Sequence, residues 1–288
     1  MQLELFRTLW GDNRRWDHPL AEARAAGFGG LEARIPPTSA QARASATILH
    51  EEDAPYIAIA MTGGGVIPNQ SAGVQEHLDD LRAAMDRAVL MAPRFVTILG
   101  GNDRWSASQQ VEFMAQAQAL CHSAGVVCCF ETHRSRILAT PWVTLDVIAQ
   151  LPDVLFTADI SHWVVCCERL LNDPADDLSA FVARVHHIQA RIGYDQGPQA
   201  PHPGAPEYAP ALHFHQSIWQ QIWQSQRARG YTTTTMTPEC GPDGYLHTLP
   251  FTNMPVADLW SLNVWTAQTE RAHFQHAMSD SGSTKELG

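Results

Sequence analysis

The chain has 288 residues, of which 19 are Lys or Arg and 30 are Asp or Glu, so its formal net charge at pH 7 is −11. A surface that binds nucleic acid or an anionic membrane needs clustered Lys and Arg, so this balance argues against both partners. We expect instead a protein that acts on a small molecule. The length suits one α/β barrel, for which about 250 residues is usual.

The chain has six cysteines, and two adjacent pairs, Cys128–Cys129 and Cys166–Cys167, lie in or beside apolar runs. Neighbours on a strand point to opposite faces, so no disulfide is expected within a pair, and no C-x-x-C spacing indicates a metal or redox site. This usage is typical of reduced core residues and predicts a cytoplasmic protein. No basic segment followed by a long apolar stretch opens the chain, and no membrane segment is expected.

Short apolar runs alternate with amphipathic stretches along the chain, a pattern typical of repeated β-strand and α-helix. The expected strands are residues 3–9, 29–35, 56–61, 94–99, 126–131, 154–159, 185–189 and 232–239. The expected helices are residues 18–26, 39–50, 72–92, 106–124, 145–151, 178–184, 209–230 and 256–277. Eight strands joined by right-handed crossovers predict an α/β fold, a single (β/α)8 TIM barrel over residues 1–278. The polar residues 279–288 are expected to be a disordered tail.

Local signals support two of the helix boundaries. The run Gly27-Phe28-Gly29-Gly30 ends the first helix, because glycine permits the left-handed backbone that stops a helix before a strand. Ser106 or Ser108 is expected to cap the helix that follows Trp105.

Four predicted strands run into a polar side chain at their C-terminal end: Glu131 after VVCCF, Asp159 after VLFTA, Gln189 after VHHI and Glu239 after TTTTMTP. The carboxyl ends of parallel barrel strands meet at one rim, where barrel enzymes keep their chemistry. Three carboxylates in one pocket repel one another as bare anions, so they predict a site neutralised by one divalent cation. Oxygen ligands favour Mn²⁺ or Mg²⁺, with Co²⁺ able to substitute.

Histidines accompany these strand ends. His133 is two residues after Glu131 and therefore faces the same side of the extended chain, while His162 follows Asp159 at i+3. A lone histidine more often satisfies a hydrogen bond than binds a metal, but the pairing recurs on consecutive strands and favours a site. His187 is two residues before Gln189 and shares its strand face, so it is a candidate for substrate binding.

Other rim residues are candidates for substrate binding. Trp10 and Trp163 can supply flat apolar walls for a sugar ring, and core packing is the alternative role for each. Arg104 or Arg191 can grip an anionic or polyhydroxyl substrate, and a structural ion pair with the nearby carboxylates is the alternative. Glu32 and Arg34, on the second predicted strand, are further rim candidates.

The motifs Glu131-Thr-His133, Asp159-Ile-Ser-His162, Gln189 and Pro238-Glu239, in this order, resemble the xylose isomerase-like barrel superfamily, the sugar phosphate isomerase/epimerase group. Ketose 3-epimerases of that group hold one divalent ion with Glu, Asp, His and Glu. The resemblance implies metal ligands at Glu131, Asp159 and Glu239, with Gln189 where those enzymes have His. A Gln at this position, with Glu-x-His on the fifth strand, is similar to 3-dehydroshikimate dehydratases.

The resemblance implies a divalent-metal-dependent isomerase or epimerase that acts on a sugar or sugar-like hydroxyketone through an enediolate. Glu131 and Glu239 then exchange a proton with the substrate from opposite sides, and His162 holds a hydroxyl. The alternative is a dehydratase or lyase of the 3-dehydroshikimate dehydratase or 3-oxo-sugar type, in which His133 removes the proton α to the ketone. By analogy with such barrels, a homodimer is expected.

Overall fold

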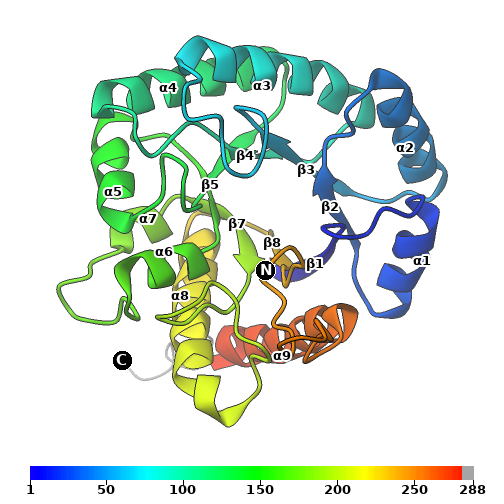
Figure 1. Ribbon diagram of the computed structural model, residues 1–288, viewed down its shortest axis with the longest axis vertical. Coiled ribbons are helices and arrows are strands. Elements are labelled where there is room, and N and C mark those ends of the chain that lie inside the picture. The colour runs from blue at the N-terminus through cyan, green and yellow to red at the C-terminus, as the bar shows by residue number, and fades with distance from the viewer. Residues whose placement is uncertain (281–288) are drawn as a thin grey trace.

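The computed structural model describes residues 1–280 and shows a closed barrel of eight parallel strands, hydrogen-bonded in chain order from β1 to β8 and back to β1. The helices form a ring outside the strands (Figure 1). The strands are β1 (Gln2–Thr8), β2 (Gly30–Arg34), β3 (Tyr56–Met61), β4 (Val96–Leu99), β5 (Cys128–Glu131), β6 (Phe156–Ala158), β7 (Val185–Ala190) and β8 (Thr233–Pro238). The predicted (β/α)8 barrel is therefore confirmed, with strand ends that differ from the predicted ones by at most two residues.

The helices follow the predicted order. They are α1 (Asp17–Ala25), α2 (Ser39–Glu51), α3 (Val74–Ala88), α4 (Ala107–Ser123), α5 (Pro141–Gln150), α6 (Ser161–Cys167), α7 (Ser179–Val182), α8 (Ala209–Ala228) and α9 (Leu259–Asp280), with 3-10 turns η1 (Val89–Met91) and η2 (Pro206–Tyr208). Because α9 continues through Asp280, the first two residues of the expected tail are helical, and residues 281–288 lie outside the described residues. Within the described part, no helix has the length and apolar character needed to cross a membrane.

Helix α6 was not among the predicted helices, which leave residues 160–177 without one. Its seven residues are too few to display the apolar periodicity that marks a helix. The Asp159 carboxylate accepts hydrogen bonds from the backbone N–H and the hydroxyl of Ser161 at the start of α6. A short helix thus follows directly from the strand-end acid, and it carries His162 toward the barrel mouth.

The barrel interior contains a small apolar cluster beneath the strand ends. Inward-facing residues pack into a cluster separate from the main core between strands and helices, namely Phe6, Ile57, Phe95 and Cys129. Side chains two residues apart share a face of a strand, so the interior face of β5 runs from Cys129 to Glu131 and then to His133. The apolar cluster is the floor above which polar side chains line the mouth.

All six cysteines are free in the described chain, which confirms that no adjacent pair is bridged. Cys121, Cys129 and Cys240 are buried, in agreement with a core role. Cys166 is exposed, so the core role predicted for it is wrong. Its position in the unpredicted helix α6 explains the difference, because only one side of that helix packs inward.

Helix α4 begins with a capping residue that the sequence predicts. The Ser106 hydroxyl accepts from the Gln109 backbone N–H, and the Gln109 side chain accepts from the Ser106 N–H at 3.0 Å. Replacing Ser106 with Ala is expected to lower the free energy of unfolding by about 1 kcal/mol, because both helix-end bonds depend on this pair. Chemical denaturation measures this difference. The control Ser108→Ala should change it by less than about 0.5 kcal/mol, and equal losses in the two variants would contradict the capping role.

Candidate active site

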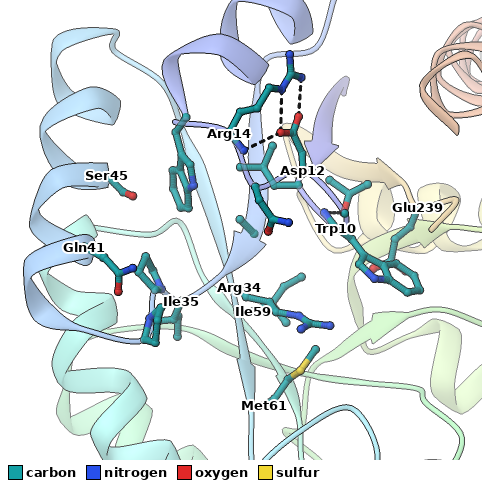
Figure 2. A pocket seen from close by; sticks show the side chains of 18 of the residues that line it. Trp10, Asp12, Arg14, Arg34, Ile35, Gln41, Ser45, Ile59, Met61 and Glu239 are labelled. Carbon is teal, nitrogen blue, oxygen red and sulfur yellow. Dashed lines mark hydrogen bonds and ion pairs between the residues drawn. The ribbon is translucent and has the colours of Figure 1, made fainter. Parts of the chain in front are cut away.

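A cavity of about 940 Å³ opens at the C-terminal ends of the strands. Its inner wall includes Glu131, His133 and Glu239, and its outer wall includes Gln41 and Ser45 of α2, whose side chains point into it (Figure 2). Ligand pockets commonly measure roughly 300–1,000 Å³, so this cavity is at the upper end of the range. It has room for a substrate that extends beyond the polar side chains at the strand ends.

The three acids singled out in the sequence lie close enough to affect one another's charge. Burial raises the pKa of Glu131 well above its usual range, and the neighbouring Asp159 adds to this shift. Burial also raises the pKa of Glu239, to which Glu131 and Asp159 contribute, although Arg191 acts in the opposite direction. The predicted convergence of three strand-end acids is therefore present, and the cluster holds excess negative charge whenever the acids are ionised.

Gln189 connects this acid cluster to a fourth carboxylate. Its side-chain nitrogen donates to Glu239 at 3.1 Å and to Glu32 at 3.2 Å, so its carbonyl oxygen faces away from both. That oxygen, one oxygen of Glu32 and one of Glu239 are buried without a hydrogen-bond partner among residues 1–280. Glu32 was named only as a rim candidate, yet its place on the inward face of β2, between Gly30 and Arg34, was readable from strand alternation.

Arg191 places a positive charge inside the cluster. Its guanidinium forms an ion pair with Asp159, lies 3.8 Å from an oxygen of Glu239 and donates to His162 Nε2 at 2.7 Å. Burial opposes the charged form, but the two carboxylates raise the pKa of Arg191 overall. Because a guanidinium only donates, His162 Nε2 must accept, so the His162 ring is neutral. The ion-pair role considered for Arg191 is present, and its side chain also lines the cavity, where substrate contact stays a prediction.

His133 is a neutral base on the cavity wall. Its Nδ1 donates to the backbone carbonyl of Arg134, which leaves Nε2 with a free lone pair. Burial lowers the pKa of His133 to about 3, and the Arg191 charge adds to this effect. The ring centroid lies 3.9 Å from that of His162, whose pKa burial also lowers. The His133 imidazole therefore offers a nitrogen lone pair rather than positive charge, whereas the His162 Nε2 lone pair is taken up by Arg191 and the other nitrogen of that ring carries the proton.

The donor set suits a divalent cation. Ligand atoms of Glu131, His133 and His162 lie within 4.8 Å of one another, and the unpartnered oxygens of Gln189 and Glu239 are buried nearby. Glu131, Gln189 and Glu239 belong to the ligand set expected from the sequence. The fourth expected ligand, the Asp159 carboxylate, forms an ion pair with Arg191. Imidazole nitrogen widens the suitable ions from Mg²⁺ and Mn²⁺ toward Co²⁺ and Zn²⁺.

Of the two tryptophans expected to form substrate walls, only Trp10 reaches the cavity. Its ring packs on Gly241, and its indole N–H donates to Asp243 at 2.8 Å. Trp163 is a correction: its fully buried indole donates to the Leu138 carbonyl at 2.9 Å and packs against Phe181 in the core. The inward face of α6 takes this side chain behind the strand rather than into the mouth.

Arg104 and His187 are further corrections to the substrate-binding set. The Arg104 side chain is exposed in the loop before α4 and does not line the cavity. His187 lies one pleat deeper in the barrel than Gln189, where its ring nitrogens contact Thr235 at 2.8 Å and Thr237 at 3.3 Å. It supports the floor of the site and does not reach a substrate. Strand alternation gives the face of a side chain, but the depth depends on barrel stagger.

Two residues of the site were missed in the sequence. Tyr245 lines the cavity with its ring beneath the Arg191 guanidinium, 4.6 Å from ring centroid to Cζ. Arg136, almost fully buried, donates to the backbone carbonyls of Thr62 at 2.7 Å and Val66 at 3.0 Å, and so fixes the loop after β3. Both lie in irregular loops, where no periodic pattern indicates which way a side chain points.

The comparisons with known proteins agree with this geometry. A family model described as xylose isomerase-like TIM barrel matches residues 20–197. No curated protein is close enough in sequence to this chain to count as a relative.

Solved structures share the fold at low sequence identity. An L-ribulose 3-epimerase has a TM-score of 0.67 at 13% identity, with 100% of both chains covered. A xylose isomerase-like TIM barrel protein from Mycobacterium smegmatis in complex with magnesium has a TM-score of 0.65 at 12% identity, with 95% of this chain and 97% of the other covered. A probable 3-DHS dehydratase from Bacillus anthracis has a TM-score of 0.55 at 14% identity, with 83% and 92% covered.

Proposed function

The chain belongs to the xylose isomerase-like TIM barrel family, and we propose that it is a divalent-metal-dependent isomerase or epimerase of a sugar or sugar-like hydroxyketone. The observation that carries this proposal is the pair Glu131 and Glu239. They come from the non-adjacent strands β5 and β8, line one cavity and have raised pKa values. The fold is shared with structures described as sugar epimerases and as a dehydratase.

Glu131, Gln189 and Glu239 would hold the ion, and His133 Nε2 is a further ligand in the isomerase or epimerase candidate, in which it is not needed as a base. When bound, a divalent ion acts as a Lewis acid on the substrate carbonyl and the adjacent hydroxyl. The buried, unpartnered oxygens of Gln189 and Glu239 support this assignment, and so does the closeness of the Glu131 and His133 ligand atoms.

The protein's own groups perform the proton transfer in this proposal. A carboxyl whose pKa is raised can take a proton from carbon and return one. Glu131 and Glu239 reach the substrate from two parts of the rim, so one removes the proton and the other supplies one to the opposite face. Arg191, held by Asp159, and His162 orient substrate hydroxyls, and Trp10 covers the ring.

A specific observation favours the second candidate, a dehydratase or lyase. His133 lines the cavity as a neutral imidazole with a free Nε2, which is the state required of a general base. In this reaction His133 removes the proton α to a ketone, and a β-hydroxyl leaves as water with a proton from a nearby carboxyl.

The two candidates predict different products. The metal-loaded protein should be incubated in deuterated water with a panel of ketoses, 3-oxo sugars and 3-dehydroshikimate. We expect deuterium on the carbon next to the carbonyl without loss of water, read by NMR, because epimerisation exchanges that hydrogen with solvent. An unsaturated product seen by absorbance would favour the lyase, and neither signal with any substrate would contradict both candidates.

A further inference from the structure

Arg34 is the one cavity arginine without a counter-charge in the described chain. Residues 1–280 place four arginines on the cavity wall, and three of them, Arg14, Arg15 and Arg191, form ion pairs with carboxylates. No carboxylate among residues 1–280 lies within ion-pair distance of Arg34, and the Arg34 side chain donates no hydrogen bond to any of these residues. Figure 2 shows this contrast, with contacts drawn from Arg14 and none from Arg34.

The position of Arg34 follows from strand alternation on β2. Glu32 faces the barrel interior, where it contacts Gln189, and Arg34 lies two residues further on the same face. Two residues of strand advance the chain by roughly 6.6 Å, so Arg34 lies above the acid cluster, toward the rim. Its partner on β3 is Ile59, and Met61 lies beyond, so its immediate strand neighbours are apolar.

Two other acids on the cavity wall, Asp12 and Asp243, already have donors. The Asp12 carboxylate accepts from Arg7 at 3.0 Å and from Arg14 at 2.7 Å, and the Asp243 carboxylate accepts from the Trp10 indole. The Arg34 side chain is exposed and lines the cavity, and among the described residues it has no carboxylate partner although the chain carries a net charge of −11. A guanidinium offers paired donors that match the two oxygens of a carboxylate or phosphate.

We propose that Arg34 binds an anionic group of the substrate, a carboxylate or a phosphate, at the rim of the cavity. The identity of the substrate as a hydroxyketone rests on the proposed function, whereas the anion site rests on the cavity alone. The reacting carbons lie over Glu131 and Glu239, and the acid group extends toward β2. The substrate class is then a sugar acid or a sugar phosphate rather than a neutral sugar.

Binding without turnover tests this assignment. The full-length protein loaded with Mg²⁺ should be titrated by calorimetry with D-gluconate, D-glucitol 6-phosphate and neutral D-glucitol, which share a six-carbon chain. Arg34→Gln is expected to weaken binding of a charged probe roughly 10- to 100-fold, because it removes hydrogen bonds to a charged group, and to change D-glucitol binding less than about twofold. The charged probe that shows the loss identifies carboxylate or phosphate as the group recognised.

Arg15→Gln is the matched control, because Arg15 also lines the cavity but is paired with Asp17 at 3.1 Å. It should leave all three affinities unchanged. Arg34→Lys should recover part of the loss, since lysine keeps the charge without the fork of donors. Charged-probe binding that is unaffected by Arg34→Gln, or an equal loss for D-glucitol, would overturn the proposal.

The outcome is separable from that of the proposed function. If no substrate exchanges deuterium but the charged probes bind through Arg34, the proposed reaction fails and the anion site stands. If a neutral ketose exchanges deuterium at full rate and Arg34→Gln changes no affinity, the anion site fails and the reaction stands.

Discussion

Replacement of Glu131 with Ala is expected to remove most of the bound divalent ion and to lower turnover by roughly 10²- to 10⁴-fold. Glu131 is almost fully buried, belongs to the group whose ligand atoms lie within 4.8 Å of one another, and also contributes a carboxyl with raised pKa. The substitution therefore removes a ligand and a proton-transfer group together. Elemental analysis measures the ion, and the deuterium-exchange assay measures turnover.

Glu51→Ala is the control for this experiment. Glu51 also lines the cavity, but its side chain is exposed on the outer wall at the end of α2. The control should keep both metal content and turnover. Equal metal content in Glu131→Ala and the unsubstituted protein would refute the assignment of Glu131 as a ligand, whatever the loss of turnover.

The barrel was predictable because its signal is repeated. Each buried strand of a parallel sheet is a short apolar run, and eight such runs separated by amphipathic stretches leave few alternative folds. Helix α6 escaped prediction because seven residues hold less than two helical turns. The role of Trp163 was misjudged for the same reason, since its direction depends on that helix and not on β6.

The candidate site was predictable where strand alternation controls the side chains. Glu131 ends β5 and Gln189 lies near the end of β7. His133 and Arg191 follow them two residues later, just past the strand ends, on the same interior side. Strand alternation does not predict which side chains of different strands contact one another. The ion pair of Arg191 with Asp159 depends on barrel stagger and on the local turn into α6, which no pattern within one strand encodes.

Glu32 and Arg34 repeat the same arrangement on β2, an acid at the inner position and a base two residues toward the rim. In the sequence they were named only as further rim candidates. In the structure, Gln189 joins Glu32 to Glu239 through one side-chain nitrogen. The site therefore extends from the four later strands to β2, and this extension makes the unpaired Arg34 part of the same mouth.

Glu239→Gln is expected to lower exchange of the substrate hydrogen with solvent by roughly 10²- to 10⁴-fold, because an amide of the same shape cannot take or give a proton. Glu32→Gln is the matched control, since both carboxylates accept from the Gln189 nitrogen. Glu32 does not line the cavity, so its substitution should leave exchange much closer to that of the unsubstituted protein.

Glu239→Gln and His133→Gln together separate the two candidate reactions. If the protein eliminates water, the proton leaves to His133, so His133→Gln should abolish the unsaturated product while Glu239→Gln retains a large part of it. If the protein epimerises, Glu239→Gln should instead lose most of the activity, because the return of a proton to the opposite face needs a second carboxyl. Full exchange activity in Glu239→Gln would therefore exclude the two-carboxyl mechanism and leave Glu131 or His133, the neutral imidazole on the cavity wall, as the base.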